Sequence, residues 1–299
     1  MAMTATRAIE WPAAGDAYWR AEPSLLVGLV LVAPLALLLG SLFVVPLVRV
    51  AWIALADPTF GLQHFREFFA SAAARRSFAT TLRVSALVTV LALAIGALVA
   101  WELRATRSRA GRLVLWAAVL FPLWTSIVVR MYALTIVLQR EGILNSVLLA
   151  VRVIDRPLEI LYTSTAVTIG ILYAMIPYAT LPLYASFVNI DEDLLRAAES
   201  LGASRARAFA SVVIPLALPS VLAAGAIVFV IAAGYYITPI VLGGPSSSFL
   251  ASRIDQQVFT LFDFPGGAAT ASILLLTALL VIGLAWRLVG FERIQRTVA

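Results

Sequence analysis

Few side chains in this sequence could carry out catalysis, because its 299 residues include no lysine, no cysteine and a single histidine, His64. A chain without cysteine has no thiol nucleophile, and with one histidine it lacks the usual ligands of a zinc site. A chain without lysine has neither the phosphate-binding loop of ATPases nor a Schiff-base lysine. We therefore expect no catalytic residues, no metal and no cofactor. We interpret His64 as a surface residue on a short amphipathic helix around residues 61–69.

The composition places the chain in a membrane. Hydrophobic residues make up 62% of it and charged residues 13%, with a mean hydropathy of +0.98. Soluble domains are only about 45–50% apolar, so a soluble globular protein is excluded, as are a disordered chain and a coiled coil. The net charge of +6 belongs to loops between apolar segments, so we expect no nucleic-acid partner. The expected fold class is an all-α membrane protein surrounded by the lipid bilayer.

Six windows with little or no charge are long enough to cross a bilayer, which takes about 20 residues. They are Ser24–Val48, Val84–Trp101, Leu113–Gln139 (interrupted by Arg130), Ile160–Ile190, 216–242 and Phe264–Trp286. The first window is too long for the apolar core of a signal peptide, so we interpret it as a retained span. The expected organisation is an N-terminal tail at 1–23, a six-span domain at 24–290 and a C-terminal tail at 291–299.

Arginine is unevenly distributed over the loops between these windows. The segments 1–23, 102–112, 187–211 and 287–299 hold 12 arginines, whereas 54–79, 139–160 and 243–269 hold 7. Because basic residues are enriched in short cytoplasmic loops, this asymmetry predicts that both termini are cytoplasmic.

The segment between the fourth and fifth windows, Asp191 to Pro219, has the pattern of two short helices outside the bilayer. Three acidic residues, 191–193, favour a helix start, and Gly202 is typical of a helix end. We expect Ser204 to begin a second helix and Pro215 to mark the turn into the membrane. The apolar residues of the first helix share one face at helical spacing: Leu194, Leu195, Ala197, Ala198 and Leu201.

This segment resembles the coupling loop of permease subunits in binding-protein-dependent ABC importers. The family pattern is Glu-Ala-Ala, three residues, Gly, nine residues and Ile-x-Leu-Pro. The matching positions here are Arg196-Ala197-Ala198, Gly202 and Val212-Val213-Ile214-Pro215, with Arg196 in place of the usual Glu. The resemblance assigns the ATPase contact, within the cytoplasmic loop 187–211, to Leu195, Arg196, Ala197, Ala198, Glu199, Leu201, Gly202 and Ala203.

Two more stretches resemble the spermidine/putrescine-type permeases in particular: residues 122–133 with 141–145, and residues 238–245 running on to 263–269. The resemblance implies six helices in the MetI-like architecture, in the inner membrane of a bacterium. It also implies a pair of ABC ATPase subunits as partners, a second permease subunit and a periplasmic or extracellular solute-binding protein. ATP hydrolysis would be supplied by the ATPases, and transport would proceed by alternating access.

The path of the cargo is expected to be aromatic. A polyamine is a polycation, yet no predicted span interior contains Asp or Glu, so ring faces are the groups left to hold a cation. Candidates are Trp124, Tyr132, Tyr235 and Tyr236, with Tyr173 and Tyr178. Arg130 is a further candidate because charge within a span commonly marks function, although it could instead brace a neighbouring backbone carbonyl.

Other readings remain open at the level of sequence. An opine, an aminophosphonate or another amino-acid-like solute would suit the same kind of permease. An ion-coupled secondary transporter or a channel is a different class, which would favour carboxylates within the membrane and inverted repeats, and neither is visible. An intramembrane enzyme lacks a plausible site.

Overall fold

The computed structural model describes residues 25–56, 59–244 and 247–289, and within these residues it contains helices and no strand. The helices, in chain order, are α1 (Leu25–Ala56), α2 (Gln63–Ala70), α3 (Ala72–Ala105), α4 (Arg109–Trp124), α5 (Ile127–Leu138), α6 (Ile143–Ala150), α7 (Ser164–Val188), α8 (Glu192–Ser200), α9 (Arg205–Ala208), the π-helical η1 (Phe209–Val213), α10 (Ile214–Ala233), α11 (Ile237–Leu242), α12 (Leu250–Asp255), the π-helical η3 (Gln256–Thr260) and α13 (Phe264–Val289). The all-α fold class is confirmed.

Six helical stretches among the described residues are long and apolar enough to cross a membrane, which confirms the predicted number. They are Val32–Ala56, Ala72–Ala105, Ile127–Ala150, Ser164–Val188, Arg205–Ala233 and Phe264–Leu288. The second, fourth and sixth predicted windows correspond to α3, α7 and α13. The predicted tails at 1–23 and 291–299 lie outside the described residues.

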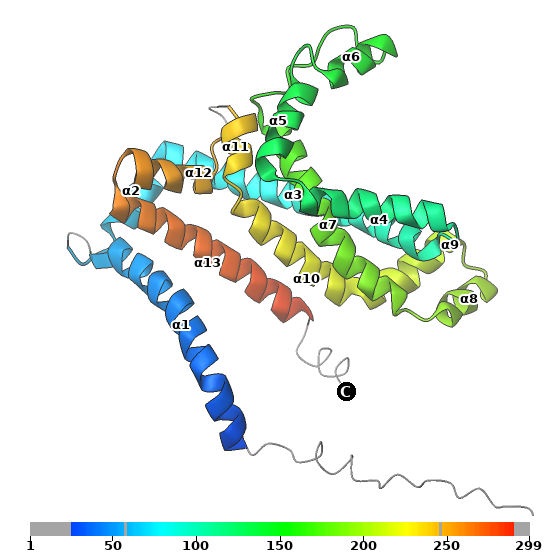
Figure 1. Cartoon of the computed structure of the whole chain (residues 1–299), viewed down its shortest axis with the longest axis horizontal. Coiled ribbons are helices and arrows are strands. Elements are labelled where there is room, and N and C mark those ends of the chain that lie inside the picture. Colours follow the sequence, from blue (N-terminus) through cyan, green and yellow to red (C-terminus); the bar gives the residue numbers. More distant parts are fainter. Residues whose placement is uncertain (1–24, 57–58, 245–246, 290–299) are drawn as a thin grey trace, which may run out of the picture. The chain divides into compact units, whose positions relative to one another are not determined.

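The chain divides into two units inside α1, one ending at Arg49 and the other beginning at Val50, and each is described by itself. In the first unit, the large apolar side chains described between Val30 and Val48 are exposed. An apolar helix with this exposure suits a lipid environment. The second unit, which starts with the last turns of α1, contains all the other helices (Figure 1).

The prediction of one continuous third span over Leu113–Gln139 is wrong. α4 ends at Trp124, Thr125 is extended (φ −84°, ψ 131°), and α5 begins at Ile127. Pro122, in the last turn of α4, has no N–H to donate to the helix, which weakens the ladder just before the break.

The prediction of one continuous fifth span over residues 216–242 is also wrong. α10 ends at Ala233, and α11 begins only at Ile237. Pro239 favours the break, because in a continuous helix its ring would collide with the carbonyl of Tyr235, four residues earlier, although α7 stays unbroken around Pro177 and Pro182.

The expected turn at Pro215 is absent. Instead, α9, η1 and α10 follow one another as a helical stretch from Arg205 to Ala233. Within η1 the N–H of Ile214 donates to the carbonyl of Phe209, five residues back. A π-turn of this kind is wider than an α-turn and accommodates a proline that lacks an N–H and crowds the preceding turn. The second helix of the predicted pair is therefore the start of the fifth span.

Three long helices, α3, α7 and α10, form the core of the second unit. Their buried contact surface is rich in small residues, including Ala92, Ala174, Ala179 and Ala232. A Cβ atom on Gly96 of α3 would lie 2.9 Å from the Cβ of Ala179 in α7. The closeness of these two helices therefore depends on the missing side chain at position 96, as is common for packed membrane helices.

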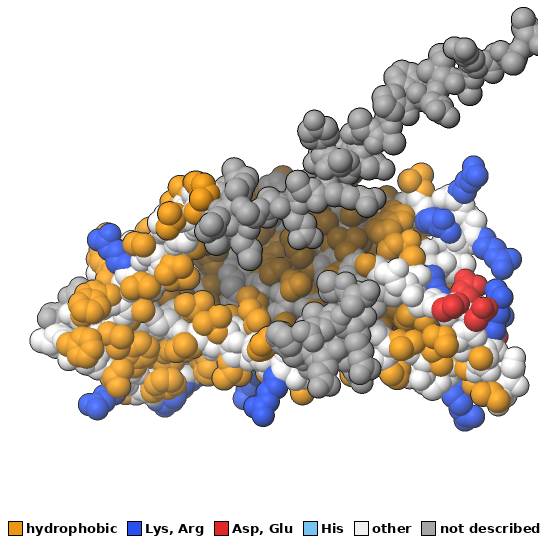
Figure 2. Space-filling model, turned by 90° about the horizontal axis from the view of Figure 1, so that it is seen from below, with side chains coloured by type: hydrophobic (Ala, Val, Ile, Leu, Met, Phe, Trp, Pro, Cys, Tyr) orange, Lys and Arg blue, Asp and Glu red, His pale blue; other side chains and the backbone are white. Residues whose placement is uncertain are grey.

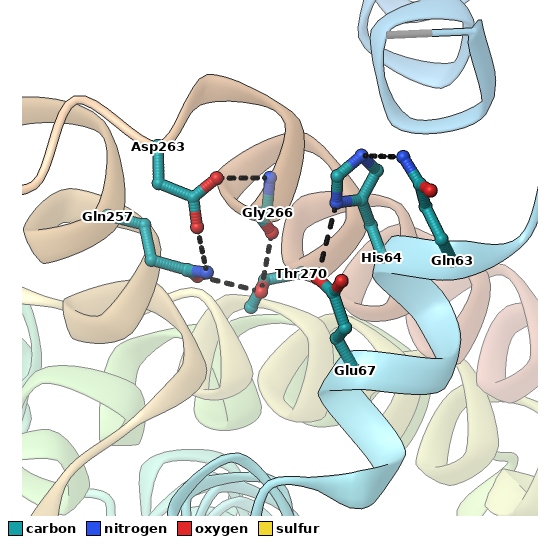
Figure 3. Close-up of polar contacts among 7 residues, drawn as sticks. All are labelled: Gln63, His64, Glu67, Gln257, Asp263, Gly266 and Thr270. Carbon is teal, nitrogen blue, oxygen red and sulfur yellow. Dashed lines mark hydrogen bonds and ion pairs between the residues drawn. The ribbon is translucent and has the colours of Figure 1, made fainter. Parts of the chain in front are cut away.

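At one end of the bundle, α2, α12, η3 and the starts of α3 and α13 lie together (Figure 1). We call this the α12 end. Asp263 caps α13 there by accepting a hydrogen bond from the N–H of Gly266 at 2.9 Å, and it also accepts one from Gln257 (Figure 3). The buried Thr270 donates to Gln257 at 2.8 Å, so the buried side chains of Thr270 and Gln257 are partners of each other.

The predicted amphipathic helix near residues 61–69 is confirmed as α2. Its Phe65 and Phe68 pack against a cluster that includes Ala74, Leu250 and Ile273. The interpretation of His64 as a surface residue is wrong, because its side chain is only 12% exposed and lies 3.5 Å from Glu67 (Figure 3). The packing of α2 against α3, α12 and α13 covers one side of this helix, and the sequence of α2 alone does not predict this contact.

Candidate functional site

The predicted coupling segment lies at the opposite end of the bundle, where α8 and α9 adjoin the end of α3 (Figure 1). We call this the α8 end. α8 begins where the sequence predicts: the Asp191 side chain caps the helix by accepting a hydrogen bond from the N–H of Asp193 at 2.9 Å. Ser204 likewise caps α9 through the N–H of Arg207. Local side-chain caps thus define both helix starts.

Gly202 makes the turn between α8 and α9. Its φ of +87° is in the left-handed region, where glycine has no steric penalty. A Cβ atom at this position would meet nothing within 4 Å. The turn therefore presents bare backbone to the outside.

The charged side chains of α8 form ion pairs with one another and with α9. Arg196, which stands where the family pattern has Glu, pairs with Glu192 at 3.2 Å and with Asp193 at 3.5 Å. Glu199 reaches Arg205 across the turn at 3.9 Å. Figure 2 shows charged side chains of both signs together at the end where α8 lies, whereas hydrophobic side chains cover most of the rest of the visible face.

The predicted apolar face of α8 is divided between two surroundings. Leu195 packs against a cluster from α3, α7 and α10, and Ala198 is half-buried. Leu194, Ala197 and Leu201 are exposed, Leu201 to 90%. α8 has no fully buried side chain, so its apolar edge has no cover within the described chain.

A second polar arrangement lies where the third span breaks. The Arg130 side chain, on α5, donates hydrogen bonds to the carbonyls of Pro122 and Thr125. These are groups that lose helical partners where α4 ends. The guanidinium also lies over the ring of Tyr173 in α7, 5.6 Å from its centroid.

The same arginine connects the two broken spans. Tyr235, which lies at the break between α10 and α11, interacts electrostatically with Arg130 and with Tyr178. We call Arg130, Tyr173, Tyr178 and Tyr235 the Arg130 junction. The structure thus brings together one arginine from α5 and three of the predicted aromatic candidates, two from α7 and one from the break between α10 and α11.

The other aromatic candidates do not join this group. Trp124 is 85% exposed and Tyr132 is 68% exposed, and neither takes part in a ring contact among the described residues. Tyr236 is 44% exposed. These three rings are available to a cargo or to a neighbouring subunit.

The family model for the inner membrane component of binding-protein-dependent transport systems matches residues 18–290. The chain belongs to this family. It is 34% identical over 207 residues to the spermidine/putrescine transport system permease protein PotB of Escherichia coli (strain K12), covering 69% of this chain and 75% of the relative. It is 32% identical over 202 residues to PotB of Haemophilus influenzae, covering 67% and 70%. The resemblance found in the sequence is confirmed, and the chain is a permease subunit of an ABC importer.

Solved structures support the same fold. A bacterial ABC transporter that imports the polysaccharide alginate matches with a TM-score of 0.71 at 17% identity, covering 88% of this chain and 95% of that one. An inward-facing MetNI methionine ABC transporter matches with a TM-score of 0.57 at 17% identity, covering 73% and 94%. At these identities the likeness concerns the fold alone.

The permease also has residues at the α8 end that the sequence did not single out. Arg104, near the end of α3, donates to the carbonyl of Ile190 at 2.7 Å, directly before the N-cap of α8. Its guanidinium lies 5.4 Å from the centroid of the Trp101 ring, and Trp101 makes edge contacts with Phe187 and Phe209. In sequence Arg104 is one more loop arginine, and only the tertiary contact reveals that it holds the base of α8.

Proposed function

We propose that this permease is the membrane subunit of a polyamine importer in the inner membrane of a bacterium. The cargo class is supported by the PotB relatives, whose identity of 34% and 32% extends over about two thirds of this chain. A purified complex should hydrolyse ATP faster when putrescine or spermidine is supplied with the solute-binding protein. Stimulation by an opine or an aminophosphonate, but not by either polyamine, would favour the alternative cargo.

The observation that carries the proposed role is the uncovered edge of α8. A helix with no buried side chain keeps its apolar residues Leu194, Ala197 and Leu201 in solvent unless a partner covers them. The open Cβ position at Gly202 allows another backbone to approach the adjacent turn closely. We propose that an ABC ATPase subunit covers this edge, with Leu195 and Ala203 holding it from the side of the permease.

Movement of the ATPases would reach the spans through the contacts beneath α8. Leu195 packs on a cluster that joins α3, α7 and α10, while Arg104 bonds the backbone just before the helix. Packed elements of this kind move as rigid bodies, so displacement of α8 would tilt the three core helices together. This supports alternating access, with the two ATPases and a second permease subunit completing the machine.

The exposed rings suit a polycation better than the Arg130 junction does. Arg130 already donates hydrogen bonds to two carbonyls and lies over the Tyr173 ring, and its positive charge repels a polyamine. Trp124, Tyr132 and Tyr236 keep exposed ring faces, which attract cations. We propose that these three rings form this chain's share of the path, and that Arg130 and Tyr235, which interacts with it, are structural.

The proposed orientation places α8 and both termini in the cytoplasm. A reporter that is active only in the cytoplasm should work when fused after Thr106 or at Ala299, and should fail when inserted within residues 246–252. The reverse pattern would move α8 to the outer face and away from any cytoplasmic ATPase. Affinity purification from native membrane should also recover an ATPase subunit, whereas transport by this chain alone without ATP would favour a secondary transporter.

A further inference from the structure

A cavity of about 710 Å³ lies at the α12 end, which is the end of the bundle opposite α8 (Figure 1). Side chains from the first three turns of α3 line it on one side, and α12 and η3 line it on the other. Its basic lining residues are Arg75, Arg76, Arg83 and Arg253. No acidic side chain is among the lining residues described, so the cavity is a concentration of positive charge.

Within the described part of the chain, Arg75 is the one arginine of this set whose guanidinium donates hydrogen bonds to the protein. Arg75 donates to the carbonyls of Phe69 and Ala70, which lie at the end of α2. Among the described residues, Arg76, Arg83 and Arg253 form no ion pair. The Nε atom of Arg253 is buried and lacks a hydrogen-bond acceptor there.

Such a group of guanidinium ions favours the binding of an anion. A buried donor without an acceptor costs free energy, and neighbouring like charges repel one another. Guanidinium groups bind phosphate oxygens in pairs of parallel hydrogen bonds, and the hydroxyls of Thr80 and Ser248 add further donors to the lining. A polycationic cargo would be repelled, which separates this cavity from the proposed path.

The exposed face of α3 next to the cavity indicates which kind of molecule carries the phosphate. Arg76 and Arg83 are seven residues apart, so they lie on one face of α3, about 10 Å apart along its axis. The same face continues with apolar side chains that are exposed: Leu87 (49%), Val90 (65%) and Leu98 (71%). The uncharged part of α3 begins directly after Arg83. Charge followed by an apolar stripe is the arrangement of a phospholipid, with its headgroup above its acyl chains.

The other wall of the cavity has a similar character. Gln256 lines the cavity, and Phe259 and Phe262, which follow it closely, are 74% and 72% exposed. Exposed apolar rings beside basic residues suit the boundary between headgroups and acyl chains.

We propose that the cavity at the α12 end binds the headgroup phosphate of an anionic phospholipid, whose acyl chains lie along the exposed stripe of α3. Arg76, Arg83 and Arg253 hold the phosphate, and Arg75 fixes the wall against α2. The lipid would neutralise the cavity and stabilise the packing of α3 against α12.

The test measures phospholipid bound to the tagged permease, purified with its accompanying subunits in mild detergent. Native mass spectrometry counts retained phospholipid, and a fluorescent phosphatidylglycerol titration gives the affinity. The pocket variant is Arg76→Gln with Arg83→Gln. The control is Arg66→Gln with Arg156→Gln, which removes the same charge from two exposed arginines outside the lining.

Wild type and control should retain phosphatidylglycerol, and the pocket variant should bind it roughly 30-fold more weakly, about fivefold for each lost arginine. Raising the salt concentration should lower the affinity of the wild type for phosphatidylglycerol towards that of the pocket variant. Equal affinity in all three proteins would overturn the proposal. A pocket variant that keeps its lipid but loses affinity for the solute-binding protein would also overturn it, because a carboxylate of that protein would then be the anion.

Discussion

The α8 end and the Arg130 junction use polar residues in opposite ways. At the α8 end, Arg196 and its two acidic partners are exposed and paired within one helix, and the apolar edge beside them is uncovered. At the junction, Arg130 reaches across the break between α4 and α5 and lies against α7. The first arrangement leaves a surface for a partner, whereas the second holds broken spans in place. Substitutions at α8 should therefore affect transport, and substitutions at the junction should affect folding.

The largest effect is expected from Gly202→Asp. An unpaired charge buried in the proposed ATPase contact costs roughly 2–5 kcal/mol, so ATP-dependent uptake should fall by roughly 30-fold or more. The matched control is Gly202→Asn, which has the same shape without the charge and, like Asp, can adopt the left-handed backbone through its short polar side chain. Uptake per assembled complex is the measurement. Normal uptake by Gly202→Asp at normal expression would remove this turn from the mechanism.

Arg130→Leu tests the other side of the comparison. It leaves the carbonyls of Pro122 and Thr125 without donors, which should lower the free energy of unfolding by about 3 kcal/mol. Thermal unfolding of the purified complex measures the loss. Arg130→Lys should be intermediate, because an ammonium group lacks the planar fork that reaches two carbonyls. An unchanged melting temperature for Arg130→Leu would show that the junction does not hold the break.

The exposed rings should respond differently from the junction. Single Ala substitutions of Trp124, Tyr132 and Tyr236 each remove an exposed ring whose cation contact would be worth about 0.5–2 kcal/mol. At least one variant should therefore lose transport per assembled complex more than it loses folded yield. If all three keep wild-type transport per complex, the aromatic path through this subunit is wrong and the second permease must recognise the cargo.

Arg196→Ala should have the smallest effect. Both ion pairs of Arg196 are exposed, and pairs of this kind contribute about 0.5 kcal/mol or less. The melting temperature of the complex should stay within experimental scatter. A large loss of stability would mean that α8 depends on its internal charges and that the two regions are less distinct than their exposure indicates.

The sequence predicts the α8 end well because its signals are local. The N-caps at Asp191 and Ser204 and the glycine at 202 act within a few residues, and the structure shows each of them in place. The sequence does not predict the breaks at Thr125 and Gly234. Their hydropathy is continuous, and proline within a membrane helix often causes only a kink.

Contacts between segments distant in the chain cannot be predicted from local sequence patterns, for a different reason. The bond from Arg104 to Ile190 joins positions 86 residues apart, and nothing in either local pattern specifies it. The amphipathic pattern of α2 predicts a surface position for His64, whereas the packing of α2 against α12 and α13 determines its low exposure. Periodicity identifies which face of a helix is polar, but not whether another helix covers that face.

The most direct test of the account is a cross-link from Leu201, which is 90% exposed beside the Gly202 turn. Because the natural chain has no cysteine, Leu201→Cys introduces a unique thiol. A short bifunctional reagent applied to the complex in native membrane should join this residue to an ATPase subunit. The control Leu98→Cys, in the apolar stripe of α3, should give no such product. A Leu201→Cys thiol that reacts only with a membrane-impermeant reagent from outside the cell, or joins only the solute-binding protein, would contradict the account.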